Sequence, residues 1–366
     1  MSEQELLAYL ALQKVPLVGD VLAKRLLLQF GSARAVFEAA STDWIQVEGF
    51  GRQLVSNMSD PVLFRQAESE LKFIKDNGVE YHSILSDTYP ENLRHCPDGP
   101  ILLFQKGDIR ISTQPIISIV GTRQITARGK DFLEMLIRSL AMYNPVIVSG
   151  FAYGADIAAQ KAALKNNLQT IGCLAHGFEQ IYPKSHLKYV EPIMNHGGFL
   201  SDFWSTDTFE RNNFLKRNRI IAGLSEATIV IESAAKGGSL VTADIANSYN
   251  REVFAVPGRT TDLFSEGCNN LIKRQQAHLI SSPEDIPLML NWREIDSNSE
   301  IKELPFPDLD EIEEKIYSYL GIHGRSFIDH ISIGCELPSY IVASKLLGLE
   351  LKNLVKPSVG KFFERV

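Results

Sequence analysis

The sequence predicts an α/β protein whose core is a mainly parallel sheet, preceded by a helical region and followed by a smaller domain of helices and a hairpin. The main observation is an alternation of short apolar segments with helix-length segments between about residues 116 and 256, which is typical of βαβ units. Residues 1–80 instead show helical periodicity broken by glycine turns. The length of 366 residues fits two or three domains.

The first region, residues 1–80, is expected to be a small helical domain. Its helical patterns are at residues 5–13, 20–30, 33–40 and 60–77. The turns at 15–19 and 47–51 resemble helix-hairpin-helix modules, in which glycines let a turn approach a phosphate closely. The first turn has Leu17 where such a module usually has glycine. Two interpretations stay open: a helical bundle with tight turns, or a bundle whose hairpins contact DNA.

Residues 81–291 are expected to form the α/β core. The expected strands are 101–105, 116–120, 146–149, 169–174, 229–232 and 253–256, and the expected helices include 127–143 and 155–165. These strands are short apolar runs rich in β-branched residues, which suit a sheet that helices cover on both faces. The domain is therefore predicted to be Rossmann-like.

The last part of the chain is predicted to be a linker and a winged helix. The segment 292–307 is polar and contains proline, as linkers do. Residues 308–366 show helical patterns at 309–320, 327–333 and 338–354 and can form a hairpin at 355–366. The region holds seven Lys and Arg against nine Asp and Glu, whereas modules that read duplex DNA are normally basic. We therefore expect it to contact protein or serve regulation, rather than act as a sequence-specific regulator.

Composition excludes several classes of protein. Hydrophobic residues make up 45% and charged residues 22% of the chain, as in soluble globular proteins. No apolar run approaches the roughly 20 residues that span a bilayer, and the acidic start is unlike a secretory signal, so a cytoplasmic location is expected.

The four cysteines lack metal-ligand or disulfide spacing, so reduced, mostly buried thiols and no metal or cofactor are expected. The net charge of −7 means that any nucleic-acid site must be local.

Three glycine-containing loops follow strands of the predicted sheet. Their candidate ligand-binding residues are Gly121, Thr122 and Arg123, then Ser149, Gly150 and Gly154, and finally Gly238, Ser239 and Thr242. Open α/β sheets bind ligands beyond the carboxyl ends of their strands, where loop amides and helix N-termini favour anions. Arg123 is placed to bind a phosphate through two N–H groups. Glycines serve packing alone in many such folds, but three loops at one edge predict an anion-binding crevice.

A basic cluster precedes an apolar helical run in the same domain. It spans residues 211–219 and contains Phe214, Lys216, Arg217, Asn218 and Arg219. Cations around an aromatic ring suit single-stranded nucleic acid, because the cations neutralise the backbone and the ring stacks on a base. The alternative is a solvated, basic helix start. The three phosphate-type loops in the same domain favour the nucleic-acid interpretation.

At these residues the chain resembles the DprA/Smf family (DNA-processing protein A). The matching motifs are 120–123 (VGTR), 149–156 (SGFAYGAD), 181–184 (IYPK), 217–224 (RNRIIAGL), 238–243 (GSLVTA), 251–258 (REVFAVPG) and 267–272 (GCNNLI). The flanks match only in layout, with a sterile-alpha-motif-like helical domain before and a winged helix after. The chain departs from the usual motifs at Thr122, Gln160 and Lys236, and none of these departures removes a cation.

The resemblance implies a function. A member of this family has an extended Rossmann fold, binds single-stranded DNA without cleaving it and forms a homodimer through that fold. It protects incoming DNA and loads the RecA recombinase during natural transformation. It implies phosphate-binding roles for Arg123, Lys184 and Arg217 and base stacking for Phe214. The complete expected DNA-binding set is Gly121, Thr122, Arg123, Ser149, Gly150, Gly154, Lys184, Phe214, Lys216, Arg217, Asn218, Arg219, Gly238, Ser239, Thr242 and Asn269.

An enzyme is the rival interpretation. Rossmann-like phosphoribohydrolases, which are nucleotide-binding hydrolases, carry a Gly-Gly-x-Gly-Thr-x-x-Glu loop that binds phosphate and supplies an acid. The loop at 237–242 lacks its third glycine and the trailing glutamate, and no nucleophile with a base stands out. Asp156 and Glu232 are the acids near the loops, and each is expected to cap a helix or order a loop. The alternative for Arg123 is an ion pair with one of these two carboxylates.

Overall fold

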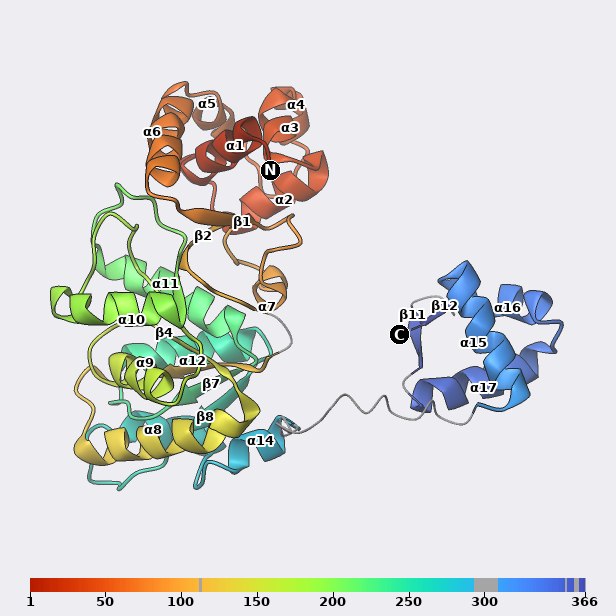
Figure 1. Ribbon diagram of the computed structural model, residues 1–366. Helices are drawn as coiled ribbons and strands as arrows, with labels where there is room; N and C mark the ends of the chain where they lie inside the picture. The colour runs from red at the N-terminus through yellow and green to blue at the C-terminus, as the bar shows by residue number, and fades with distance from the viewer. Residues whose placement is uncertain (112–113, 293–308, 353, 359–361, 366) are drawn as a thin grey trace. The chain divides into compact units, whose positions relative to one another are not determined.

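A computed structural model describes residues 1–111, 114–292, 309–352, 354–358 and 362–365 (Figure 1). Contacts divide the chain into two compact units, Met1–Ile295 and Asp296–Val366. The expected linker at 292–307 lies outside the described residues, apart from Trp292. All residues that the sequence predicts to bind DNA lie in the first unit.

A large sheet organises the first unit. Within the described residues it has nine strands in the order β1-β2-β6-β5-β4-β3-β7-β8-β9. The strands are β1 (Glu80–Ser83), β2 (Leu102–Gly107), β3 (Ile116–Val120), β4 (Val146–Ser149), β5 (Thr170–Cys173), β6 (Gly197–Ser201), β7 (Ala227–Val230), β8 (Glu252–Ala255) and β9 (His278–Leu279). All neighbours from β6 to β9 pair in parallel, and β1 and β2 add antiparallel pairs at one edge. The expected α/β class with a mostly parallel sheet is confirmed.

The described helices of the first unit form an N-terminal group, α1 to α6, and a set that packs along the sheet (Figure 1). They are α1 (Glu3–Gln13), α2 (Asp20–Phe30), α3 (Ala33–Glu38), α4 (Ser41–Trp44), α5 (Leu54–Met58), α6 (Val62–Asp76), α7 (Glu91–Arg94), α8 (Ala127–Leu140), η1 (Ala141–Tyr143), α9 (Ala155–Lys165), η2 (Lys184–Tyr189), α10 (Val190–Asn195), α11 (Arg211–Leu224), α12 (Gly238–Ser248), α13 (Glu266–Lys273) and α14 (Asp285–Met289). The helices predicted from periodicity are found within a few residues of their expected bounds.

The alternation of side chains along the central strand β3 explains the layers. Ile117 and Ile119 pack into the hydrophobic cluster that includes α8 and α9. Ile116 and Val120 pack into the other cluster, which includes α11 and α12. The same cluster continues into the N-terminal helices, with Leu10 and Leu26 fully buried (Figure 1). Residues 1–78 therefore share a core with one face of the sheet.

The two glycine turns of the N-terminal region lie close together. Leu17 has a φ of +68° and is 77% exposed, so it adopts the left-handed conformation that favours glycine. Gly49 in the second turn has a φ of +88°. Arg25 on α2 donates a hydrogen bond of 2.9 Å from Nη1 to the Glu48 carbonyl oxygen, which joins α2 to the second turn. DNA contact by these turns stays a prediction.

A buried cation joins the N-terminal helices to α11. Arg219 is 8% exposed and donates from Nη2 to carboxylate oxygens of Asp20, at 3.0 Å, and of Asp202. Its Nη1 donates to the Asp98 carbonyl oxygen at 2.7 Å. The segments that carry Asp20, Asp98 and Asp202 thus meet at one guanidinium on α11. Burial disfavours the charge of Arg219, but the carboxylates of Asp202 and then Asp20 raise its pKa overall.

The second unit is small and has its own core. It contains α15 (Glu311–His323), β10 (Ser326–Phe327), α16 (Ile328–Gly334), α17 (Ser339–Leu351), β11 (Val355–Ser358) and β12 (Phe362–Arg365). The described strands pair antiparallel in the order β10-β12-β11. Ile316, Leu320, Val342 and Leu346 are among its buried residues. Helices and a hairpin occur where the sequence predicts them, and the winged-helix assignment stays a prediction.

Two of the exclusions drawn from composition can be compared with the structure. Among the described residues, no helix is both long and apolar enough to cross a bilayer. The four cysteines are free and buried, as expected from their spacing. Burial raises the pKa of the Cys173 thiol to about 12, which makes it a poor nucleophile at neutral pH.

Arg219→Ala should destabilise the first unit. The change leaves Asp20 and Asp202 largely buried without their cation, so the free energy of unfolding should fall by about 3 kcal/mol. Lys216→Ala, at an exposed position of the same helix, is the matched control and should stay within about 0.5 kcal/mol of the parent. Urea unfolding followed by circular dichroism measures both variants. Equal losses would contradict the role of the Arg219 junction.

Candidate nucleic-acid interface

The largest of the described cavities lies at the carboxyl ends of the central strands. It has a volume of about 720 Å³. The chain runs outward from β3 through β4 to β6, then returns to place β7 on the other side of β3. Between β3 and β7 the strand order reverses, and ligands of open α/β sheets bind at such switch points. Val120 and Gly121 after β3, and Ser233 and Ala234 after β7, line the cavity.

Backbone hydrogen bonds hold the first two loops of this cavity together. The Thr122 N–H donates to the Glu232 carbonyl oxygen at 2.7 Å, and the Ala155 N–H donates to the Thr122 carbonyl oxygen at 3.1 Å. Gly154 has a φ of +75°, and a Cβ atom there would lie 2.2 Å from the Thr122 oxygen. Only glycine allows this approach. The backbone that carries Arg123 is therefore fixed before any ligand binds.

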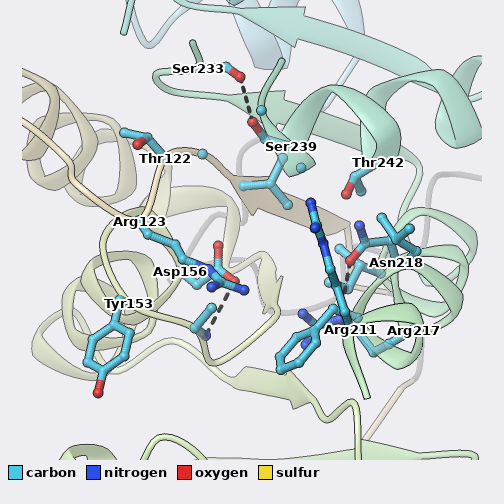
Figure 2. Close-up of a pocket in the computed structure, with 18 of the residues that line it drawn as sticks. Thr122, Arg123, Tyr153, Asp156, Arg211, Arg217, Asn218, Ser233, Ser239 and Thr242 are labelled. Carbon is cyan, nitrogen blue, oxygen red and sulfur yellow. Dashed lines mark hydrogen bonds between the residues drawn. The ribbon is translucent and has the colours of Figure 1, made fainter. Parts of the chain in front are cut away.

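Arg123 is the exposed cation of the cavity's first loop. Its guanidinium carbon lies 5.5 Å from the ring centroid of Phe214, and Figure 2 shows its side chain and that of Asp156 pointing toward each other. No ion pair joins Arg123 to Asp156 or Glu232 in this described part of the chain. Glu232 instead accepts hydrogen bonds from Thr126 N–H at 2.9 Å and Thr126 Oγ1 at 2.5 Å. Glu232 thus orders the start of α8, as expected.

Arg217 is part of the cavity lining but is buried instead of projecting into solvent. It is 4% exposed and donates from Nη1 to the Gly150 carbonyl oxygen at 2.6 Å and to that of Cys173. Burial lowers the pKa of its guanidinium, and the nearby Asp156 opposes that shift. Burial likewise raises the pKa of Asp156, and Arg217 is the largest opposing influence. Each group stabilises the charge of the other within the cavity lining.

Aromatic side chains form one wall of the cavity. The ring of Tyr182 lies 5.1 Å from that of Phe209 and 6.0 Å from that of Phe214, measured between centroids. Tyr182 is 41% and Phe209 38% exposed. Ring faces that remain open to solvent at a binding cavity are suited to stacking on bases.

Small polar groups line the remainder of the cavity. Ser239 Oγ donates to Ser233 Oγ at 2.9 Å, and Asn218 Oδ1 accepts from Arg217 Nε at 3.3 Å (Figure 2). Gly238 begins α12, and a Cβ atom there would meet nothing within 4 Å. The open N-terminus of this helix faces the cavity, where its backbone N–H groups favour an anion.

The structure brings part of the predicted residue set to this cavity. Gly121, Thr122, Arg123, Phe214, Arg217, Asn218, Gly238, Ser239 and Thr242 line it. Gly150 and Gly154 shape the loop behind it. Lys184 is exposed at the start of η2 but is not in the lining.

The other members of the predicted set have different surroundings. Ser149 is fully buried and donates to the Ile119 carbonyl oxygen at 2.6 Å. Asn269 exchanges hydrogen bonds of 3.1 and 3.0 Å with the backbone of Gly258. Arg219 is held by carboxylates, as described above, and Lys216 lines a neighbouring cavity. Ser149, Asn269 and Arg219 order the fold, so their placement does not support contact with DNA. Lys216 lies beyond the main cavity.

Sequence reasoning did not select several residues that line the cavity. They are Tyr153, Tyr182, Phe209, Glu210 and Arg211. Figure 2 shows the Arg211 side chain extending into the cavity from the first residue of α11. Arg211 precedes Phe214 by three residues, a spacing that places both side chains on one face of a helix. The sequence therefore contained a signal for Arg211. Tyr182 and Phe209 come from irregular segments, where no periodicity indicates direction.

Comparison with known proteins places the cavity in a recognised domain. The family model of DNA recombination-mediator protein A matches residues 80–291. DNA processing protein DprA of Streptococcus pneumoniae is 39% identical over 204 residues, which are 56% of this chain and 72% of that protein. The X-ray structure of DNA processing protein A from Streptococcus pneumoniae has a TM-score of 0.67 at 31% identity, covering 79% of this chain and 99% of that one.

A second similar solved structure is that of DNA processing protein A from Helicobacter pylori, which concerns its single-stranded DNA binding mode. Its TM-score is 0.53 at 30% identity, covering 58% of this chain and 98% of that one.

Gly150→Ala should disturb the cavity floor. A Cβ atom at Gly150 would lie 2.5 Å from Asp156 Oδ2 and 2.7 Å from Arg217 Nη2, both of which are held by other contacts. We expect a loss of about 1–3 kcal/mol in the free energy of unfolding. Gly238→Ala, where the added atom meets nothing within 4 Å, should lose none. Differential scanning fluorimetry of the two variants compares them, and a tolerated Gly150→Ala would contradict the tight floor.

Proposed function

Because the chain belongs to the DprA/Smf family of DNA recombination mediators, we propose that its cavity binds single-stranded DNA. The observation that carries this proposal is Arg123, an exposed cation without an ion pair in the described cavity, beside an open aromatic wall. The Helicobacter pylori relative, studied for its single-stranded DNA binding mode, supports it.

The chemistry of the cavity favours a single strand over a duplex. Arg123 and the N-terminus of α12 supply groups that bind phosphate. Phe214 and Tyr182 supply ring faces, and only an unpaired strand can turn its bases onto such rings. A duplex keeps its bases stacked inside, so it would gain the phosphate contacts alone. With a net charge of −7, the chain has no overall field to bind duplex unspecifically.

Binding without catalysis is the second part of the proposal. A nucleotide hydrolase would need a carboxylate free to act in the cavity. Glu232 is engaged by Thr126, and Asp156 accepts from the Ala152 N–H at 3.3 Å beside Arg217. Neither Glu232 nor Asp156 is therefore positioned as a general base. The other acid in the lining, Glu210, is exposed at the residue before α11 and has no neighbouring nucleophile in the lining to activate. Incubation with labelled strands and nucleotides should therefore release no product.

The family also suggests partners for this chain. We propose that the central domain forms a homodimer in the cytoplasm and loads the RecA recombinase onto the bound strand during natural transformation. Light scattering of the full chain at micromolar concentration reports the dimer. Formation of RecA filaments on strands already coated with a single-strand-binding protein reports loading. We further propose that residues 308–366 are a winged helix that contacts protein.

Single strands should bind far better than duplexes of the same length. Fluorescence anisotropy with labelled 20-nucleotide probes across a salt series should show affinity for the single strand that falls as salt rises, because a few local cations displace counterions. The matched control is the same probe annealed to its complement. Equal affinity for the two forms would contradict the proposed function.

Arg123→Ala should reduce single-strand affinity without unfolding the chain. Loss of one phosphate contact should also lower the salt slope by about one unit. Arg123→Lys should fall between the parent and alanine, because lysine keeps the charge but not the two-point contact. Arg128→Ala, another exposed arginine outside the lining, should bind like the parent.

Phe214→Ala is the comparison that separates stacking from charge. It should weaken binding by about 1–3 kcal/mol with an unchanged salt slope, since no cation is removed.

A large fall in melting temperature for Arg123→Ala, with affinity retained at low temperature, would make Arg123 a structural residue instead.

A further inference from the structure

A second cavity lies next to the proposed DNA site, on the side of the N-terminal helices. Its volume is about 620 Å³. Leu215 lines both this cavity and the first, and it is 45% exposed, so it forms a low partition between them. The far wall is built by residues around the start of α2, including Val18, Gly19 and Arg25. Two regions that are distant in the sequence thus line the second cavity, which shares Leu215 with the first.

Most acidic side chains of the second cavity have ion-pair partners, whereas its exposed Lys216 has none in the described chain. Asp20 and Asp202 are bound by Arg219, and Asp207 is bound by Lys14 Nζ at 2.5 Å. Lys216 is exposed beside the Leu215 partition and makes no ion pair in the described chain. Three acids of this cavity therefore have fixed cationic partners, although Asp20 and Asp202 share one, while Lys216 is available to a phosphate.

One buried carboxylate oxygen indicates a different kind of contact. The Asp202 side chain is 10% exposed and lies in the cavity wall, and its Oδ1 atom has no hydrogen-bond partner among the described residues. A buried acceptor without a donor is costly. This oxygen is closed to solvent, so a base reaches it only after the surrounding side chains move. An exocyclic amino group of a nucleobase would then donate to it, whereas a phosphate would not.

We propose that a single strand bound in the first cavity continues past Leu215 and Lys216 into the second, so that the N-terminal helical region lengthens the DNA footprint. The inference rests on the proposed function of the first cavity. Lys216 then binds a phosphate at the partition, and a base beyond it lies near Asp202. The N-terminal region adds affinity only for strands long enough to reach it.

Gly19 offers a test that leaves the fold intact. It precedes α2 with a φ of −87°, and a Cβ atom there would meet nothing within 4 Å. Asp and Asn are both favoured at this position, where their side chains cap the helix. Gly19→Asp therefore adds a negative charge to the open cavity, and Gly19→Asn adds the same shape without charge.

The experiment measures anisotropy of thymidine and cytidine oligonucleotides of about 5 and about 15 nucleotides, lengths that bracket a single binding module. Gly19→Asp should lower affinity for the long strands about five-fold relative to Gly19→Asn, with no change for the short ones. Lys216→Gln should do the same, and Lys130→Gln, an exposed lysine on α8, should not.

The outcomes distinguish this inference from the proposed function. Equal affinities of Gly19→Asp and Gly19→Asn for long strands would overturn the second cavity while the short strands still bind. Loss of short-strand binding in the Gly19→Asp variant would also overturn it, because the two cavities would then not act in series. Failure of the parent chain to bind either length would instead remove the proposed function.

Discussion

The geometry of the site depends on the guanidinium of Arg217. It binds the carbonyl oxygens of Gly150 and Cys173, which follow or end neighbouring parallel strands, and it lies beside Asp156. A buried guanidinium needs such acceptors, because removing its charge from water costs several kcal/mol unless partners replace the solvent. Carbonyl oxygens at strand ends supply them. The helix that carries Phe214 is thereby fixed to the sheet edge that carries Arg123.

Helix α11 distributes its cations by helical geometry. Successive residues turn by about 100°, so Arg217 faces the strand ends, Arg219 faces Asp20 and Asp202, and Lys216 remains exposed between them. A basic cluster that looks uniform in sequence therefore has three different roles. The buried members hold the helix in place, and the exposed ones are available to a ligand. The positive charges of Arg217 and Arg219 thus stabilise the fold, whereas that of Lys216 remains available to a ligand.

The strands and glycine loops were predictable because their signals are local. A short β-branched run and a glycine followed by a helix are visible in a few residues, and β3, β4 and the loop at Gly121 were found where expected. β6 was missed because it begins with Gly197 and Gly198, which resemble a turn. The engagement of Arg219 was not predictable, because its partner Asp20 lies 199 residues away in the sequence. Asn269 was likewise assigned by motif alone, and its partner Gly258 shows that it orders a loop.

The same distant contacts connect the N-terminal region to the site. Leu17 has a left-handed backbone conformation although it is not glycine, and this conformation costs roughly 1 kcal/mol or more. Packing of the surrounding residues must therefore hold the turn in place. Packing of this kind comes from the shared core of the N-terminal helices and the α11 face of the sheet. Because Arg219 also fixes Asp20 at the first residue of α2, the start of that helix cannot shift independently of α11. The N-terminal helices are therefore joined to the sheet through a shared core and one buried guanidinium, which together hold the start of α2 beside α11.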